Sequence, residues 1–384
     1  MNRLYKFSVM LIFPLLLAAC DTANDVWASV SKSDGNLVGI IFQNGVECLG
    51  EEAQPKEGDV LYVSFEGDDS NPGTETAPLG TLAYAICNLV PGQTLNIAPG
   101  VYQESIIMGA FGNSSAPIVI RANPGEDSRP VLEGESTRTI GIALVESTNI
   151  IVEGLEFSNY LDEGLLILEG SDFIIRDNKF TANGRASVDP DHDEEGFGVN
   201  VLGAKDVLIE GNEAADNGPN QERWENFALG TGINTYGNSN VIIRDNYIHG
   251  TTGGGILVED SDNVLVENNR IEDNQLDANG DYWDGGIWVD GGRDITLRGN
   301  QITNNNGPGI VLSDEDVQYP GASHGYVVEN NQISGNLVGI SMWNWGMCPV
   351  EESIIQLKDN QLDGNDDGET WCVDWECGVG EPCE

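Results

Sequence analysis

One eleven-residue sequence motif, here called the phrase, recurs seven times between residues 172 and 366 of this chain. It reads apolar, x, apolar, x, x, Asn, x, apolar, x, x, Asn, as in FIIRDNKFTAN and VLVENNRIEDN. Its first asparagines are Asn178, Asn212, Asn246, Asn269, Asn300, Asn331 and Asn360. Five residues after each of these stand Asn183, Asn217, Thr251, Asn274, Asn305, Asn336 and Asn365. A fixed phrase with spacers of variable length predicts a solenoid whose insertions leave from particular corners.

A second strand signal follows each phrase, a glycine before an apolar residue, as in Gly255-Ile256 and Gly286-Ile287. Each coil is therefore expected to hold two or three short strands, with apolar side chains alternating inward. The asparagines at the bends are expected to hydrogen-bond their equivalents in the next coil. Leu155 stands where the preceding coil would carry one, so this ladder is expected to begin at Asn178.

Composition fits one elongated, turn-rich β domain and excludes one class of partner. The 384 residues include 48 Gly and are 40% hydrophobic, which is unlike a disordered chain. The net charge of −46, from 63 acidic and 17 basic residues, would repel a phosphate backbone, so nucleic acid is excluded as a partner. The same charge fits solubility, tolerance of high salt, or binding of divalent cations.

The first twenty residues have the pattern of an export signal. Arg3 and Lys6 precede an apolar stretch too short to span a bilayer. Leu17-Ala18-Ala19-Cys20 resembles the bacterial lipobox, which implies removal of the preceding residues and lipidation of Cys20. The protein is therefore expected to be exported and anchored by lipid to a bacterial membrane, at the outer membrane or the cell surface. An ordinary cleaved signal with an incidental cysteine is the alternative.

The domain layout follows from these segments. Residues 21–58 are expected to form a polar tether, in which the apolar run 37–42 can add a strand. Residues 79–90 have apolar positions at helical spacing, and an amphipathic helix here would cover the open end of the β core.

The stretch Leu61–Glu104 resembles the amino-terminal cap of the right-handed parallel β-helix superfamily, which includes family-nine pectate lyases and alginate lyases. The resemblance implies an all-β, single-stranded right-handed parallel β-helix over residues 59–375, with an N-terminal capping helix. Residues 376–384 then form a disulfide-rich C-terminal cap or tail. This fold hosts lyases, hydrolases, epimerases and non-enzymes, so it does not select a chemistry.

Six cysteines remain once Cys20 is set aside, and an even number in an exported protein suggests disulfides. The economical pairing joins Cys48 to Cys87 and forms two bridges among Cys348, Cys372, Cys377 and Cys383.

The coils lengthen at a few places, and binding residues concentrate in such loops. Insertions at 184–197, 218–231 and 275–285 leave from the same corner and should project on the same side, whereas 313–325 leaves from another corner. The first three carry carboxylates, and two of them carry tryptophan. An aromatic ring suits the apolar face of a sugar, while carboxylates suit its hydroxyls, acid–base catalysis or a cation.

The first insertion holds the densest acidic run. Asp189, Asp191 and Asp193 alternate and offer three oxygen ligands for Ca²⁺, although the run also fits a solvated acidic loop. A second calcium pattern runs from Asp363 to Asp374, but its Asn365 already belongs to the ladder, and a disulfide-bound end cap is the alternative.

A strip for sugar binding is expected along one strand row. Trp288 should point outward in line with Asn200 and Asn234 of neighbouring coils, and a structural tryptophan under a loop is the alternative. The insertions add aromatic candidates for the same ligand, namely Trp224, Tyr282 and Trp283.

Two chemistries remain open. Glu195-Gly196-Phe197 resembles the Asp-Gly-Phe calcium motif of family-nine lyases, but no lysine stands where their base would be needed. A base would have to come from His192, His324, Arg185, Arg223 or Tyr282. A hydrolase needs only two carboxylates, for which Asp193 or Glu195 with Asp284 is the expected pair.

The sequence therefore predicts an exported, lipid-anchored monomer that cleaves glycosidic bonds of an acidic polysaccharide by lyase or hydrolase chemistry, with Ca²⁺ as cofactor. Its membrane contact would be through the lipid alone. The alternative is a non-catalytic glycan-binding or adhesion protein at the cell surface.

Overall fold

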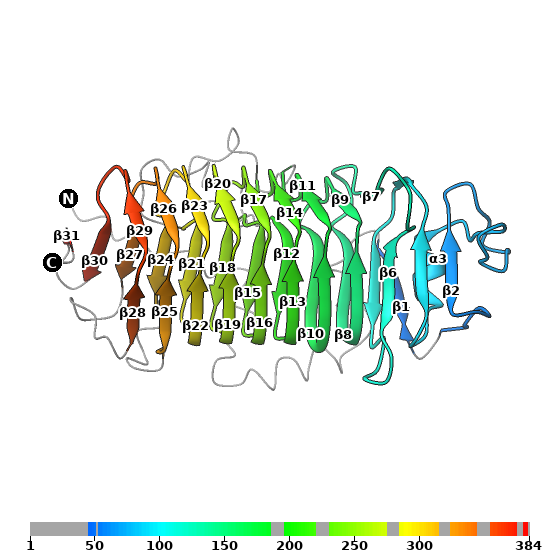
Figure 1. Ribbon diagram of the computed structural model, residues 1–384. Helices are drawn as coiled ribbons and strands as arrows, with labels where there is room; N and C mark the ends of the chain where they lie inside the picture. The colour runs from blue at the N-terminus through cyan, green and yellow to red at the C-terminus, as the bar shows by residue number, and fades with distance from the viewer. Residues whose placement is uncertain are drawn as a thin grey trace, which may run out of the picture.

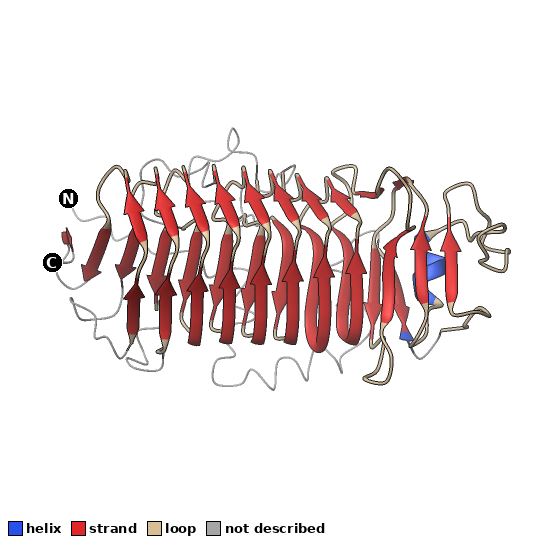
Figure 2. Cartoon of the chain, viewed as in Figure 1, coloured by secondary structure: helices blue, strands red, loops and turns tan. Residues whose placement is uncertain are grey.

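The chain winds into an elongated parallel β-helix (Figure 1). The computed structural model describes residues 45–50, 53–185, 196–219, 230–274, 284–314, 323–343, 354–374 and 379–382. Almost all of its regular structure is strand (Figure 2). Successive coils contribute strands to three parallel rows, so residues distant in sequence become neighbours across coils.

The first row holds the strands that open each coil. They are β1 (Val46–Leu49), β5 (Ile106–Gly109), the first halves of β8 (Ile140–Glu153) and β10 (Glu163–Arg176), β12 (Phe197–Leu202), β15 (Ile233–Tyr236), β18 (Ile256–Glu259), β21 (Ile287–Asp290), β24 (Ile310–Ser313), β27 (Ile340–Trp343) and β30 (Thr370–Asp374).

The second row follows after a tight corner or an insertion. It holds β2 (Val60–Val63), β3 (Thr94–Ile97), β6 (Ile118–Ala122), the second halves of β8 and β10, β13 (Lys205–Glu210), β16 (Ser239–Arg244), β19 (Asp262–Glu267), β22 (Arg293–Arg298), β25 (Tyr326–Glu329) and β28 (Ile355–Lys358).

The third row consists of shorter strands. They are β4 (Gly100–Tyr102), β7 (Pro130–Glu133), β9 (Glu156–Ser158), β11 (Lys179–Thr181), β14 (Glu213–Ala215), β17 (Tyr247–His249), β20 (Arg270–Glu272), β23 (Gln301–Thr303), β26 (Gln332–Ser334) and β29 (Gln361–Asp363).

The predicted asparagine ladder is confirmed. Between the second and third rows, the Asn178 Nδ2 donates to Asn212 Oδ1 at 3.1 Å, and the Asn212 Nδ2 donates to Asn246 Oδ1 at 3.0 Å. The same bond repeats down to Asn360. Each amide also donates to a backbone carbonyl of the preceding coil, as Asn246 does to Ile209 and Asn269 to Ile243. Leu155 precedes the ladder, and its backbone N–H donates to Asn178 Oδ1 at 3.0 Å. A second ladder runs from Asn183 at the next bend.

A left-handed residue stands before every asparagine of the first ladder. The set comprises Asp177, Gly211, Asp245, Asn268, Gly299, Asn330 and Asp359, with φ between 51° and 66°. Aspartate, asparagine and glycine tolerate this conformation better than other residues. The bend therefore selects the Asp-Asn, Asn-Asn and Gly-Asn pairs of the phrase.

The interior is a continuous column of side chains from all three rows. In one coil Ile256, Val264 and Ile271 are each no more than 2% exposed. Gly255 opens this coil because a Cβ there would lie 2.6 Å from the Cγ2 of Ile271. The glycines directly before β15, β18, β21, β24 and β27 thus allow the corner to close on the core.

The N-terminal end is covered by the predicted helix, which forms as α3 (Leu82–Cys87) and is shorter than the 79–90 pattern. The hydroxyl of Thr81 accepts from Tyr84 N at its start, and Leu82 and Ile86 are buried. The disulfide between Cys48 and Cys87 is confirmed, with the two Cα atoms 5.2 Å apart. It fastens the helix to β1.

β1 corrects one boundary. The strand lies within 21–58, the stretch expected to be a tether, yet it pairs in parallel with β5 of the first row. The run 37–42 lies outside the described residues.

The C-terminal end is closed by a different device. β31 (Val379–Pro382) pairs antiparallel with β30. Cys372 in β30 is disulfide-bonded, whereas Cys348, Cys377 and Cys383 lie outside the described residues. Within the part of the chain that the structure describes, no helix is long and apolar enough to span a membrane.

Candidate functional site

The outward side chains of the first row form one line along the molecule. The register aligns Leu166, Asn200, Asn234, Leu257, Trp288, Val311 and Ser341, here called the outward line. The predicted alignment of Trp288 with Asn200 and Asn234 is therefore confirmed. These residues alternate with core residues such as Val199 and Ile233.

The outward line is not an exposed strip. Trp288 is 7% exposed, Asn200 5% and Asn234 6%. The period-two alternation of a strand gives the direction of a side chain but not whether another segment covers it. The line is thus a buried layer outside the core, and its polar members need partners there.

Two of these polar members form a directed chain with a carboxylate. The Asn234 Nδ2 donates to Asn200 Oδ1 at 2.9 Å, and the Asn200 Nδ2 donates to Glu163 Oε1 at 3.0 Å. Glu163 aligns with Phe197, three residues before Asn200, so the second bond is diagonal to the register. The Oδ1 of Asn234 is buried and accepts no hydrogen bond from the described residues.

Trp288 is tied to a second polar group on the same face. Its Nε1 donates to the Ser313 hydroxyl at 2.7 Å, and that hydroxyl contacts Asp290 Oδ1 at 2.8 Å. The indole is therefore buried and fixed in orientation, which agrees with the alternative of a structural tryptophan.

Of the expected carboxylate pair only Asp284 lies inside the described ranges, together with the candidate bases Arg185 and the exposed His324. Asp284 follows the third insertion, has a left-handed φ of 49° and is 6% exposed. Backbone contacts link Gly196, Gly230, Gly253 and the Asp284–Gly285 corner in successive coils. Gly196, beside Glu195, is therefore three coils or about 14 Å away along the axis from Asp284.

The other predicted catalytic, metal and aromatic residues lie outside the described residues and stay predictions. They are Asp189, Asp191, His192, Asp193, Glu195, Arg223, Trp224, Tyr282 and Trp283. Within the described ranges, no group of three or more His, Cys, Asp or Glu is placed to hold a metal ion. In the second calcium pattern, Asn365 Oδ1 already accepts two hydrogen bonds from Asn336.

Arg185 fastens the corner from which the insertions leave. Its guanidinium donates to the carbonyls of Asp216, Gly250 and Pro219 and to the Thr252 hydroxyl, at 2.6–3.4 Å. Burial lowers the pKa of Arg185, while nearby Asp216 opposes the shift. This residue was a candidate base, but its donors are spent on the backbone of two following coils, so it acts in positioning.

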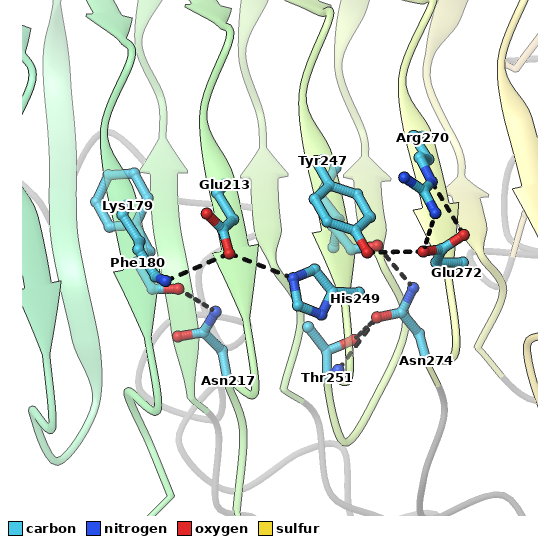
Figure 3. Close-up of polar contacts among 11 residues, drawn as sticks. Lys179, Phe180, Glu213, Asn217, Tyr247, His249, Thr251, Arg270, Glu272 and Asn274 are labelled. Carbon is cyan, nitrogen blue, oxygen red and sulfur yellow. Dashed lines mark hydrogen bonds and ion pairs between the residues drawn. The ribbon is translucent and has the colours of Figure 1, made fainter.

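A polar cluster on the third row was not predicted (Figure 3). Here Glu213 contacts Lys179 at 3.4 Å and His249 at 3.5 Å, while His249 stacks on Tyr247. The sequence signal is positional: Lys179, Glu213 and Tyr247 each follow a ladder asparagine by one residue.

The far side of this cluster centres on Glu272. The Tyr247 hydroxyl donates to Glu272 at 2.6 Å, and Arg270 lies over the Tyr247 ring at 4.6 Å while pairing with the same carboxylate. The hydrogen bond to Glu272, with some burial, raises the pKa of Tyr247 to about 12. Burial opposes the charge on Glu272, but hydrogen bonds from Tyr247 and Arg270 outweigh it and lower the pKa of that carboxyl. The cluster is internally paired, which suits stabilisation of the third row.

Comparisons with known proteins agree with this architecture. The family described as "Right handed beta helix region" matches residues 220–355, and "Pel9A-like, right handed beta helix region" matches residues 61–244. An alginate lyase from Paenibacillus superposes with a TM-score of 0.56 at 17% identity, over 75% of this chain and 94% of that chain. At this identity the likeness shows the fold.

Two curated relatives match shorter stretches. An uncharacterized protein YwoF of Bacillus subtilis is 35% identical over 103 residues, 26% of this chain and 22% of that protein. Pectate lyase PEL9 of Emericella nidulans is 35% identical over 77 residues, 20% of this chain and 18% of that protein. The chain thus matches about a fifth of the length of each relative.

Proposed function

Because the chain belongs to the right-handed parallel β-helix superfamily, we propose that it binds a polysaccharide along the first row and cleaves its glycosidic bonds. The observation that carries this proposal is the outward line, where Asn200, Asn234 and Trp288 lie in register on the row that the insertions precede. Amide side chains suit sugar hydroxyls, whereas Trp288, at 7% exposed, offers little surface to a sugar ring and acts in positioning. The similarity to a pectate lyase supports a polysaccharide as the ligand.

Hydrolysis fits the described face better than elimination does. Hydrolysis needs two carboxylates, one to protonate the leaving oxygen and one to activate water or attack the sugar. Elimination across a uronate needs a base for the C5 proton and a cation for the carboxylate. The described first-row strands from β12 to β30 contain neither Lys nor Arg. A lyase would therefore depend on Ca²⁺ and on insertion residues such as His192 and Arg223.

The proposed pair is Asp284 with Asp193 or Glu195, and the proposed calcium ligands are Asp189, Asp191 and Asp193. The three-coil offset between Gly196 and Asp284 requires the first insertion to extend along the axis for the pair to meet. We further propose export and anchoring through a lipid on Cys20, which would place this face in contact with extracellular polysaccharide.

Product analysis tests the reaction. The protein is incubated with neutral and uronate polysaccharides, with Ca²⁺ and with chelator, and both reducing ends and ultraviolet absorbance are followed. Hydrolysis predicts new reducing ends without absorbance, whereas elimination predicts absorbance from the unsaturated product. Asp284→Asn should lower the rate at least about 100-fold if the carboxylate is an acid or base.

Gln332→Ala, on the exposed face of the third row, is the matched control and should leave the rate unchanged. Binding of a glycan with no product would instead support the second candidate, a non-catalytic glycan-binding protein. The amide pair Asn200 and Asn234 favours that candidate, because amides bind hydroxyls but supply neither a general acid nor a general base. Absence of both binding and product across the panel would refute the proposal.

A further inference from the structure

The polar step of the outward line is confined to two adjacent coils. Leu166 precedes Asn200 in the register and Leu257 follows Asn234, so apolar side chains flank the amide pair on both sides. Within this step the hydrogen bonds run in one direction, from Asn234 to Asn200 to Glu163. This three-residue chain is here called the amide relay.

Glu163 fixes the direction of the amide relay. An ionised carboxylate only accepts hydrogen bonds, so Asn200 must turn its NH₂ group toward Glu163 and its oxygen toward Asn234. Asn234 must then donate its own NH₂ group to that oxygen, because two facing amide oxygens would repel each other. The Asn234 oxygen is consequently left at the end of the relay.

That terminal oxygen lacks a partner where a partner is needed. Asn234 is only 6% exposed, and its Oδ1 accepts no hydrogen bond from the described residues. Buried polar atoms in folded proteins almost always have a hydrogen-bond partner. The atom lies outside the core, on the same line as Trp288. A ligand on this face would therefore meet an acceptor at this coil.

We propose that the amide relay determines substrate specificity: the Asn234 oxygen takes a hydrogen bond from a sugar hydroxyl or amide N–H and rejects a carboxylate at this position. The inference rests on the proposed function, because it assumes a sugar chain on the first row. A uronate carboxylate here would face an acceptor oxygen backed by the charge of Glu163. The relay thus favours a neutral sugar unit over the acidic one expected from the sequence.

Calorimetric titration of the whole protein tests this inference with defined probes. The probes are a neutral galactose tetrasaccharide, an N-acetylglucosamine tetrasaccharide and a galacturonate tetrasaccharide, all at one high salt concentration to screen the net charge. The wild type should bind at least one neutral probe at least tenfold more tightly than the uronate.

Two variants separate the relay from general effects. Asn234→Leu, which repeats the residue found one coil later, should weaken the preferred neutral probe at least tenfold. Glu163→Gln should lower the ratio of neutral to uronate affinity at least threefold. A neutral amide at position 163 can donate as well as accept, so it no longer fixes which way Asn200 and Asn234 point. Glu259→Gln removes an equal charge from an outward position of β18 and should leave discrimination unchanged. A melting curve for each variant confirms folding.

The outcomes are distinguishable. If the wild type binds none of these probes and none of the neutral and uronate polysaccharides used for product analysis, the proposed function fails. If it binds but prefers the uronate, or if Asn234→Leu and Glu163→Gln both leave discrimination unchanged, the relay does not set specificity. An equal narrowing in Glu163→Gln and Glu259→Gln would assign the effect to charge alone and would also overturn the inference.

Discussion

Each inner asparagine of the first ladder makes several hydrogen bonds with one side-chain amide. Asn246 donates from Nδ2 to the Ile209 carbonyl and to Asn269 Oδ1, and its Oδ1 accepts from the backbone and side chain of Asn212. These partners are buried, so no water replaces a lost bond. The cost of removing one amide is therefore set by the groups left behind.

Asn246→Ala should lower the free energy of unfolding by about 3 kcal/mol or more, since each buried group left without a partner costs about 1–3 kcal/mol. Asn360→Ala is the matched comparison, because Asn360 is half-buried and ends the ladder. It should cost about 1 kcal/mol. Urea denaturation followed by circular dichroism measures both, and equal losses would contradict a burial-dependent ladder.

The sequence predicted most of these residue roles because the phrase repeats them. It could not predict the amide relay, since the Glu163–Asn200 bond is diagonal to the register and leaves no period in the sequence. The third-row cluster escaped for a related reason. Its positions have fixed spacing from the ladder but change identity from coil to coil, from Lys179 to Glu213 to Tyr247.

At the scale of elements, the cap joins α3 to the first complete coils. The carboxylate of Glu104 accepts from the backbone N–H groups of Leu82 and Ala83 at 2.8 and 2.7 Å. Burial raises the pKa of Glu104 above 4.5, and the two backbone hydrogen bonds only partly offset this. The protonated form is thus favoured by folding.

The raised pKa of Glu104 makes the protein less stable as the pH rises. A carboxyl group with a raised pKa contributes stability that is fully present below pH 4.5 and is lost as the pH rises through the folded-state pKa. Relative to Glu104→Gln, the wild type should therefore lose stability as the pH rises above about 4.5 and through the folded-state pKa of Glu104. Melting temperatures across this range measure the difference.

The elements themselves were largely predictable. Helical spacing located α3, and economy of pairing located the Cys48–Cys87 disulfide. β1 was missed because a strand of four residues, Val46–Leu49, has too few alternations to stand out from a polar segment. Only its pairing with β5, sixty residues later in the chain, makes β1 part of the β-helix.

At the scale of the whole molecule, charge opposes folding. The net charge is −46, and several of the few cations are already committed to pairs between coils, such as Arg244 with Glu210 and Arg298 with Glu267, both at 2.6 Å. Exposed pairs of this kind contribute roughly 0–1 kcal/mol each. Repulsion among the surplus carboxylates extends over the entire surface.

Sodium chloride should therefore raise the melting temperature by several degrees between about 10 mM and 500 mM, because the Debye length shrinks from about 30 Å toward a few ångströms. A monovalent salt is used in place of Ca²⁺, so that screening of charge is measured apart from binding of Ca²⁺ at a specific site. Differential scanning calorimetry gives the measurement. A melting temperature that falls with salt would mean that the ion pairs between coils outweigh the repulsion.

The corner glycines bear on how such a protein can change over generations. Gly218 approaches Gly230 so closely that a Cβ on the former would lie 2.9 Å from the Cα of the latter, and Gly184 meets Gly196 in the same way. The first two insertions, 184–197 and 218–231, thus each begin and end at nearly one point of the β-helix. The sequence of such an insertion can be replaced, or taken from a homologue, without disturbing the coils beneath it. New binding specificity can therefore evolve while the scaffold stays constant.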